Sequence, residues 1–438
     1  MGLTDGADFC LRAKNLSAGL FARLIKENKM NIDCNALKKS IAENKDTYIE
    51  LEKLLTSHKA LAPENGGDGE LEKCIALENF LRSHGITNLE RFDAPDTRVS
   101  SGIRPNLVAT IDGESNDYSI WIIAHMDVVP TGDLSLWNSD PWTVVEKDGK
   151  LFGRGVEDNQ QGLVSAFAAA WAYANAGVKP AHTVKLLFAA DEEVGSHYGV
   201  IWLLENTDLF KKGDFVIIPD GGDSKGETIE VAEKNIVWFE FTTTGKQCHG
   251  SRPDEGKNAC LAASDLALRL RKNLTAAFNK HDSLFTPDYS TFEPTMRKAN
   301  VEGVNIIPGS DVLCFDCRIL PCYSCDEVIA KADSICREVE KDYGVKISYK
   351  ILQKAQSVAT SKDALVVKLL SDVLRETHGI DAKVIGIGGG TVGAELRNKG
   401  FDCVVWSTLD ETAHMPNEYC IIDNLVKDAQ TLAVLMSK

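Results

Sequence analysis

Four side chains able to bind a metal ion lie within three residues of the ends of short apolar runs in the sequence: His125, Glu192, Glu193 and Asp220. These runs have the length and the Val and Ile content of strands that are buried on both faces of a sheet. In α/β sheets, ligands bind beyond the carboxyl ends of the strands, so we expect these side chains to converge.

Two further candidate ligands lie in loops. Asp158 lies in the glycine-punctuated segment 152–162, before an Ala-rich stretch of helical length, where it could cap the helix or bridge two metal ions. His414 follows the last apolar run and supplies a second imidazole. Imidazole and carboxylate ligands suit zinc, cobalt or manganese. We therefore predict bound divalent cations, Zn²⁺ in preference to Co²⁺ or Mn²⁺. The five ligands would be His125, Asp158, Asp220, His414 and one of the adjacent Glu192 and Glu193.

Two more acidic residues are suited to supporting roles. Asp127 lies two residues after His125, so on an extended segment both side chains point the same way. A metal-bound imidazole usually donates its second N–H to a carboxylate, and we expect Asp127 to orient His125. Hydrolysis at neutral pH also needs a base beside the metal, and of the adjacent Glu192 and Glu193 one carboxylate could bind metal while the other faces its bound water. Taken singly, each residue could equally form a surface hydrogen bond or a solvated acidic pair, so the prediction depends on their convergence.

The elements that must position these residues are those of an α/β protein. Residues 17–58 and 69–84 have helical spacing, and from 107 to 218 short apolar strands alternate with helices, a pattern that resumes after 354. A mixed sheet sandwiched by helices is the expected fold. Between the two parts, residues 236–354 read as β-α-β-α-β with a polar insertion at 274–297, which predicts a ferredoxin-like α+β lid.

The length of 438 residues exceeds what one core usually holds, about 250 to 300 residues. We predict a discontinuous catalytic domain, 1–235 and 355–438, whose first 59 residues form a helical N-terminal extension of unassigned role. Residues 236–354 form the predicted lid domain.

Composition excludes several classes of function. The net charge of −16, with no basic run, argues against nucleic acid as a partner. No export signal and no stretch of about 20 apolar residues is present, so we expect a cytoplasmic protein without a membrane partner. The 12 cysteines read as reduced thiols. A structural zinc site in the two C-x-x-C pairs is disfavoured because the pairs are too close together and the first lies on an alternating strand: Cys314, Cys317, Cys322 and Cys325.

Five segments together resemble the co-catalytic zinc metallopeptidases, a family that includes dipeptidases, aminoacylases, glutamate carboxypeptidases and succinyl-diaminopimelate desuccinylase: 124–130, 153–159, 190–195, 218–220 and 412–418. The resemblance implies that His125 and Asp220 hold one metal, that Glu193 and His414 hold the other, and that Asp158 bridges them. It also implies that Asp127 orients His125, that Glu192 is the general base, and that the peptide after Asp158 is cis.

The resemblance extends to the predicted lid and to a glycine-rich loop. It makes His249 a donor to the substrate carbonyl, and it makes Asn305 and Arg318 contacts for a substrate carboxylate. Arg318 could instead form a structural salt bridge with Asp316. The loop 386–391 resembles the family's substrate loop, in which backbone N–H groups approach a carboxylate; its residues are Gly388, Gly389, Gly390 and Thr391.

We therefore expect an amide hydrolase for a small substrate with a free carboxylate. Asp at position 220 resembles the dipeptidases and aminopeptidases, so a dipeptide or another short peptide is the first choice. The alternatives are an N-acyl amino acid deacylase or desuccinylase, a mononuclear enzyme, and a catalytically inactive binding protein of the same fold. A homodimer that places His249 in the partner's site is a further possibility that the resemblance raises.

Overall fold

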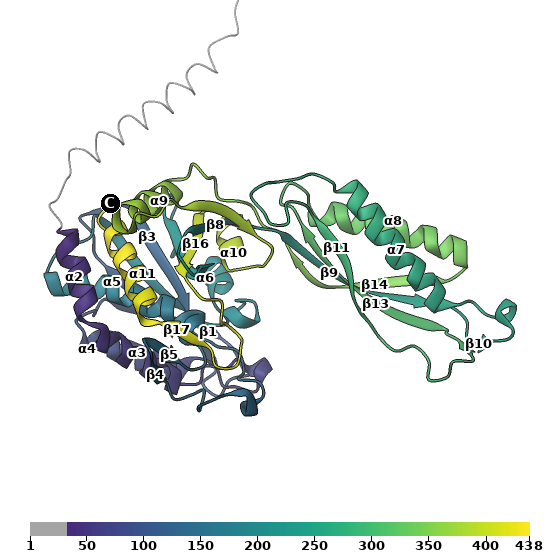
Figure 1. Cartoon of the computed structure of the whole chain (residues 1–438), viewed down its shortest axis with the longest axis horizontal. Coiled ribbons are helices and arrows are strands. Elements are labelled where there is room, and N and C mark those ends of the chain that lie inside the picture. The colour runs from purple at the N-terminus through teal and green to yellow at the C-terminus, as the bar shows by residue number, and fades with distance from the viewer. Residues whose placement is uncertain (1–32) are drawn as a thin grey trace, which may run out of the picture.

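The computed structural model describes residues 33–438. A large mixed sheet flanked by helices forms one part, and a second, smaller sheet with two helices projects from it (Figure 1). The predicted fold class is confirmed. Of the helical segment predicted at 17–58, residues 17–32 lie outside the described part, and the rest forms α2 (Cys34–Glu43) and α3 (Lys45–Ser57).

The large sheet has eight strands in the order β1-β2-β6-β3-β7-β16-β8-β15. The strands that carry the candidate ligands are parallel neighbours, because β3 pairs in parallel with both β6 and β7, and β7 pairs in parallel with β16. Their bounds are Leu89–Pro95 (β1), Ile103–Ile111 (β2), Ser115–His125 (β3), His182–Ala189 (β6), Phe215–Asp223 (β7), Thr228–Glu233 (β8), Lys383–Ile387 (β15) and Asp402–Thr408 (β16).

Both faces of this sheet are covered, and alternate residues of each central strand serve opposite faces, as the pleat requires. Along β3, Ile122 packs into the larger core and Ile123 into the smaller one. Helices α6 (Val200–Asn206) and α10 (Gly393–Asn398) cover the smaller core. The larger core is covered by α2, α3, α4 (Leu71–Ser83), α5 (Gly162–Ala176), α9 (Leu365–His378) and α11 (Ile422–Leu435).

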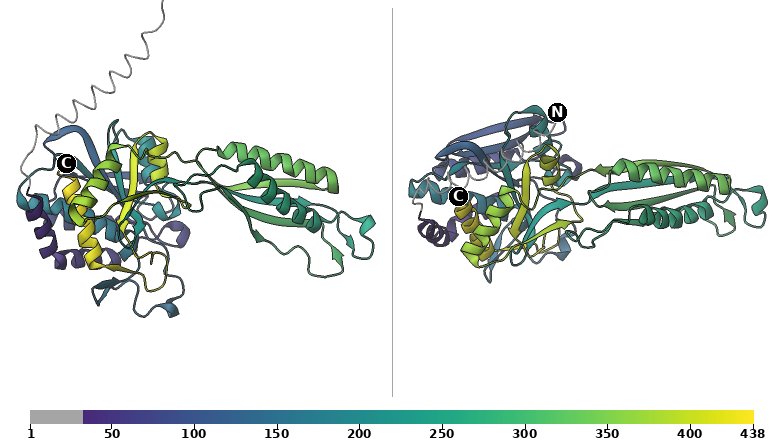
Figure 2. Two further views of the ribbon diagram at one scale, coloured as in Figure 1. Left: turned by 45° about the horizontal axis from the view of Figure 1, so that its top comes forward. Right: turned by 90° about the horizontal axis from the view of Figure 1, so that it is seen from above.

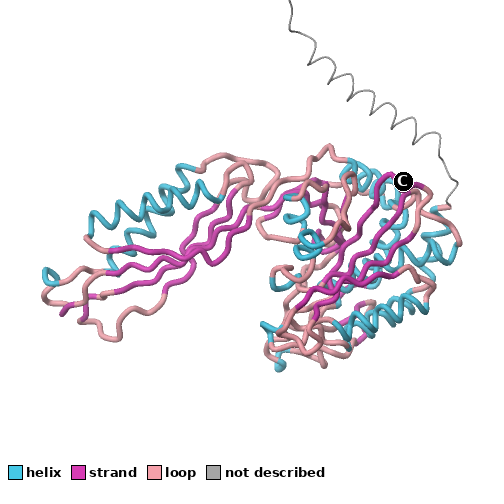
Figure 3. The backbone as a smooth tube through the Cα atoms, turned by 180° about the vertical axis from the view of Figure 1, so that it is seen from behind, coloured by secondary structure: helices cyan, strands magenta, loops and turns pink. Residues whose placement is uncertain are grey.

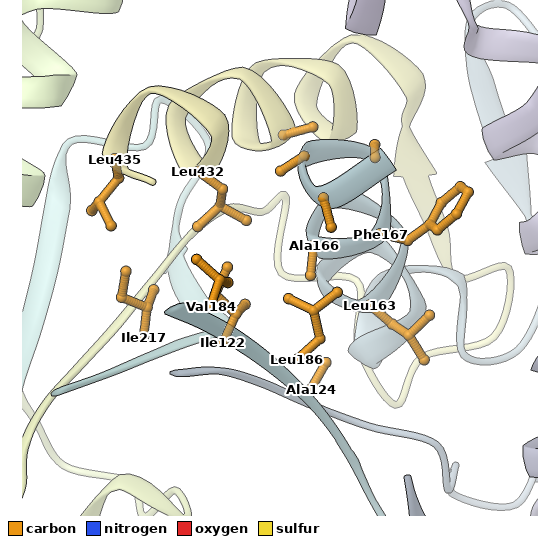
Figure 4. Close-up of a cluster of buried hydrophobic side chains, with 14 of the residues drawn as sticks. Ile122, Ala124, Leu163, Ala166, Phe167, Val184, Leu186, Ile217, Leu432 and Leu435 are labelled. Atoms are coloured by element: carbon orange, nitrogen blue, oxygen red, sulfur yellow. The ribbon is translucent and has the colours of Figure 1, made fainter. Parts of the chain in front are cut away.

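The larger core is built on the contact of α5 and α11 with the sheet, shown in Figure 4. The Ala-rich face of α5 allows its backbone to approach the strands closely, while Leu432 of α11 is completely buried. Helix α11 was not anticipated, although its apolar residues recur at helical spacing. The N-terminal helices α2 and α3 belong to this core, since Leu37, Tyr48 and other side chains are buried in it. The described half of the predicted extension is therefore part of the globular body.

The second sheet has the antiparallel order β11-β13-β9-β14. With α7 and α8 on one face it forms a separate core, and Figures 1, 2 and 3 show it extending away from the large sheet. The bounds are Asn235–Thr244 (β9), Ala259–Ala277 (α7), Thr291–Arg297 (β11), Ser310–Ile319 (β13), Cys325–Tyr343 (α8) and Lys346–Ala355 (β14). We call this unit the lid; the exact limits of the two domains stay a prediction.

One prediction for the lid was wrong. The polar insertion at 274–297 contains strand β11, so the order is β-α-β-β-α-β, the full ferredoxin-like pattern. The strand gives little signal in the sequence because it lies at the sheet edge with mostly exposed side chains, and Pro294 adjoins a bulge in it. Such residues are typical of edge strands and hide the alternation of a buried strand.

The remaining strands form small sheets. Strands β17 (Tyr419–Ile421), β5 (Lys150–Phe152) and β4 (Val145–Lys147) join the C-terminal region to the loop before Asp158. In the lid, β10 (Cys248–His249) pairs with β12 (Ile306–Ile307). No two of the lid cysteines are bonded, and within residues 33–438 no helix is long and apolar enough to cross a membrane.

Candidate metal centre

The three parallel strands β6, β3 and β7 bring three of the five predicted ligands, His125, Glu193 and Asp220, to one edge of the large sheet. His125 is the last residue of β3, and Asp220 lies in the carboxyl-terminal half of β7. Strand β6 ends at Ala189, and the short turn η4 (Glu192–Val194) follows it. Because parallel strands end at the same edge, residues nearly a hundred positions apart become neighbours.

The side chains of the five predicted ligands meet around Asp158. The Nε2 atom of His125 lies 2.9 Å from Oδ1 of Asp158, and the Nε2 atom of His414 lies 3.0 Å from its Oδ2. His414 Nε2 also lies 3.0 Å from Oε2 of Glu193, and His125 Nε2 lies 3.7 Å from Oδ2 of Asp220. The two oxygens of one carboxylate thus face two different histidines, as a bridging ligand requires.

The donor set fits metal ions better than it fits a hydrogen-bonded cluster. Among the described residues, two groups have ligand atoms within 4.8 Å of one another, His125 with Glu192 and Asp220, and His125 with Asp158 and Glu193. The Oε1 atom of Glu193 is buried and has no hydrogen-bond partner in the protein. Buried polar atoms are rarely left unpaired, so an unpaired carboxylate oxygen beside two imidazoles indicates a cation.

The pKa values of the cluster in the metal-free protein also indicate a cation site. Burial raises the pKa of the Glu192 carboxyl to about 8, against the opposing effect of His125, and burial raises the pKa of Asp220 well above its usual range. Hydrogen bonds to Asp158 and Glu193 raise the pKa of His414 to about 10. Without a cation, the cluster therefore retains protons at neutral pH, which divalent ions would displace.

Asp127 is fully buried and touches both halves of the cluster. The Nδ1 atom of His125 lies 3.0 Å from the main-chain oxygen of Asp127 and 3.5 Å from its carboxylate, so the nearer partner is the carbonyl. The carboxylate of Asp127 instead accepts the backbone N–H groups of Glu192 and Glu193, each at 3.0 Å. It therefore positions η4 as well as the histidine.

The peptide bond between Asp158 and Asn159 is cis, as predicted. Asn159 was not among the predicted site residues, yet its amide nitrogen donates to Oδ1 of Asp220 at 2.6 Å and to the carbonyl of Pro219 at 2.7 Å. It thereby links the loop that carries one ligand to the strand that carries another. Its place beside Asp158 in a glycine-rich loop was the only sequence signal for such a role.

The model of Peptidase family M20/M25/M40 matches residues 121–438, well over half of the chain. The chain belongs to this family. A relative in Methanococcus maripaludis, described as an uncharacterized metallohydrolase, is 42% identical over 405 residues, covering 88% of this chain and 97% of the relative. A Wolbachia pipientis (subsp. Culex pipiens) protein named succinyl-diaminopimelate desuccinylase is 28% identical over 383 residues, covering 86% of this chain and 90% of that protein.

Among solved structures, the aminopeptidase PepT of Bacillus cereus has the same fold, with a TM-score of 0.71 at 18% identity, over 90% of this chain and 98% of the other. Membership of this family identifies the protein as a metal-dependent hydrolase. It therefore favours an enzyme over the alternative of a catalytically inactive binding protein.

The lid of this M20-family hydrolase divides the predicted substrate contacts between its two ends. Arg318 lies opposite Ile236 at the end of the lid sheet next to the large sheet. His249 lies in β10 at the far tip of the lid (Figure 1), where β10 pairs with the strand that follows Asn305. Eight residues of β9 separate the two ends, roughly 25 Å at about 3.3 Å per residue. Within one chain, the structure does not bring His249 and Asn305 to Arg318.

Arg318 forms the salt bridge with Asp316 that was the alternative to a substrate contact. Its Nε and Nη2 atoms donate to Asp316 at 2.7 and 3.0 Å, and its Nη1 donates to the carbonyl of Gly388 at 2.8 Å. Three of the five guanidinium N–H donors are used, which leaves two. In the adjoining loop, the hydroxyl of Thr391 donates to Glu233 at 2.6 Å, whereas Gly389 and Gly390 are exposed.

Proposed function

We propose that the protein hydrolyses the amide bond of a small substrate that ends in a free carboxylate, using two divalent cations, with a dipeptide or short peptide as the first choice of substrate. The observation that carries this proposal is the position of Asp158, whose two carboxylate oxygens lie within 3.0 Å of two different imidazoles. His125 and Asp220 would hold one cation and Glu193 and His414 the other. Zn²⁺ suits this mixed nitrogen and oxygen ligand set, and Co²⁺ or Mn²⁺ are the alternatives.

Bound cations of this kind polarise the substrate carbonyl and make water nucleophilic at neutral pH. Glu192 would take the proton from the attacking water and later return it to the leaving amine. Its backbone N–H donates to Asp127 at 3.0 Å, which fixes the turn that carries it, and a carboxylate beside the metal ligands is a residue type that can carry out this proton transfer.

The carboxylate of the substrate would bind at the base of the lid. The two free N–H donors of Arg318 and the exposed backbone of Gly389 and Gly390 provide hydrogen-bond donors from both domains. Arginine donors suit a carboxylate because their planar geometry matches it. Asp316 would hold the guanidinium in place rather than compete with the substrate.

His249 and Asn305 would act on a neighbouring molecule. They lie at the lid tip, remote from Arg318 of their own chain, so we propose a homodimer in which each lid tip reaches the partner's metal centre. Coexpression of His249→Ala with Glu192→Gln tests this, because a mixed dimer would contain one centre with both an intact Glu192 and an intact His249. Recovery of about a quarter of the wild-type activity is expected for random pairing in a closed dimer. No recovery, with mixed dimers demonstrated, would contradict the shared site.

N-acyl amino acids, N-succinyl amino acids included, are the second candidate substrates. The relative named succinyl-diaminopimelate desuccinylase favours them, whereas Asp220 favours peptides by the family resemblance. A panel of dipeptides, N-acetyl and N-succinyl amino acids, assayed with each metal and with a chelator, separates the two. Chelator-sensitive turnover of dipeptides above the acyl compounds supports the first choice, and the reverse order supports the second.

A further inference from the structure

Two buried glutamates that are not predicted ligands connect the loops of two ligands. Glu157 precedes Asp158 directly, and Glu418 follows His414 by four residues. Their exposed fractions are 2% and 0%. Buried carboxylates need several donors, so their hydrogen bonds show what each of them holds.

Glu418 binds the loop that carries Asp158. Its Oε1 accepts the backbone N–H groups of Glu157 and Asp158 at 3.0 and 3.1 Å, and its Oε2 accepts that of Gly155 at 2.9 Å. The Nη1 atom of Arg154 donates to Oε2 at 2.7 Å. Both oxygens of Glu418 are therefore occupied by groups from one short loop, including the backbone of the bridging ligand itself.

Glu157 binds the loop that carries His414. Its Oε1 accepts the backbone N–H of Asp410 at 2.7 Å, and its Oε2 accepts both the backbone N–H and the hydroxyl of Thr412, the hydroxyl at 2.8 Å. In this loop His414 has a φ of +63°, a left-handed conformation that is uncommon for residues other than glycine. Such a conformation persists only when the surrounding contacts enforce it.

The contacts of Glu157 and Glu418 are reciprocal, because each glutamate lies in one loop and binds the other. A carboxylate beside Asp158 holds the loop of His414, and a carboxylate beyond His414 holds the loop of Asp158, although about 250 residues separate the loops in sequence. We propose that Glu157 and Glu418 form a reciprocal clasp that positions Asp158 and His414 for the cation they share. They are positioning residues and do not bind the metal. This inference rests on the proposed function, because it assumes that Asp158 and His414 are ligands.

A carboxylate is required at both positions. Ionised carboxylates are pure acceptors, and hydrogen bonds to charged groups are the strong ones. Glutamine has nearly the same shape but would direct an NH₂ group at a backbone N–H on at least one side, so that the loop must shift. Loss of a group that orients a metal ligand typically costs 10- to 100-fold in metal affinity.

The test is metal binding by the full-length chain after removal of all metal. Zn²⁺ is titrated into wild type, Glu157→Gln and Glu418→Gln by calorimetry, and Co²⁺ absorption spectra report ligand geometry. Wild type should bind two ions. Each variant should bind at least one ion more weakly by 10- to 100-fold, with an altered Co²⁺ spectrum, and added metal should restore activity. Restoration by metal separates a positioning role from general damage to the fold.

Asp311→Asn is the matched control, because Asp311 is a buried, ion-paired carboxylate on strand β13 of the lid, away from the large sheet. It should lower the melting temperature while leaving both ions bound as in wild type. If the glutamine variants do not fold, Thr412→Val removes a single donor to Glu157 and should weaken one ion severalfold. Unchanged affinity for both ions in the folded variants would overturn the clasp. Fewer than two ions in wild type would instead contradict the proposed function.

Discussion

Glu192→Gln should make the metal-free protein more stable while it removes activity. The substitution keeps the shape of the side chain but removes a carboxyl whose pKa burial raises to about 8. In the unfolded chain the same group ionises at 4.5. Folding therefore forces this carboxyl either to stay ionised in a buried site or to bind a proton. Glutamine is uncharged and avoids both costs.

The size of the effect follows from the two pKa values. At pH 7, roughly 2.5 units above the ordinary pKa of a glutamate, the folded protein must keep the Glu192 carboxyl protonated. At about 1.4 kcal/mol per pH unit, this reduces the free energy of unfolding by about 3 kcal/mol. The cost is present above the unfolded pKa and disappears below it, so the gain from Glu192→Gln should fall to about 1 kcal/mol at pH 5 and rise to about 4 kcal/mol at pH 8. For a domain of this size, 3 kcal/mol corresponds to roughly 3–6 °C in melting temperature.

The assay is thermal unfolding of chelator-treated protein at pH 5, 7 and 8, together with turnover of the metal-loaded protein. Loss of a general base should reduce turnover by a factor on the order of 100 or more, with two metal ions retained. Glu50→Gln, on the exposed face of α3, is the control and should change neither quantity. A lower melting temperature for metal-free Glu192→Gln at pH 7, or near-normal turnover, would refute the reasoning.

Three further predictions concern the metal, the substrate and the core. Metal removal should abolish hydrolysis and lower the melting temperature more at pH 8 than at pH 6, because Asp220 and His414 retain protons that compete with the metal at lower pH; calorimetric scans with and without Zn²⁺ measure this. Arg318→Ala should raise KM for a substrate with a free carboxylate by about tenfold, and should leave KM unchanged for the amidated analogue, if it binds that carboxylate. Leu432→Ala should cost about 2–5 kcal/mol in urea unfolding, because Leu432 is fully buried, without altering metal stoichiometry.

Much of the fold and of the metal cluster could be predicted because the signals were local. Strands such as β3 and β6 are continuous apolar runs with a chemical group at the end, and the rules for α/β sheets state where such ends meet. Strand β11 gave no such signal, since most of its side chains are exposed at the edge of the lid. The apolar residues of helix α11 recur at helical spacing, so this helix could also be predicted from the sequence.

The supporting groups of the centre could not be predicted in the same way. Glu157, Asn159 and Glu418 lie in segments that resemble the family, but their sequence does not show which remote groups they contact. The separation of His249 from Arg318 likewise depends on the length and direction of the lid strands. Residue type indicated which groups could do chemistry, whereas only the fold shows which groups hold them in place.

Strand β16 has a consequence for synthesis of the chain. It lies in the interior of the large sheet, between β7 and β8, yet it begins at Asp402, close to the carboxyl terminus. A nascent chain that has already formed the lid still exposes the unpaired backbone edge of β7, a surface prone to pairing with other chains. Translational pausing or truncation before residue 402 should therefore yield an aggregation-prone product, whereas the lid, whose strands are contiguous in sequence, can pair before synthesis ends.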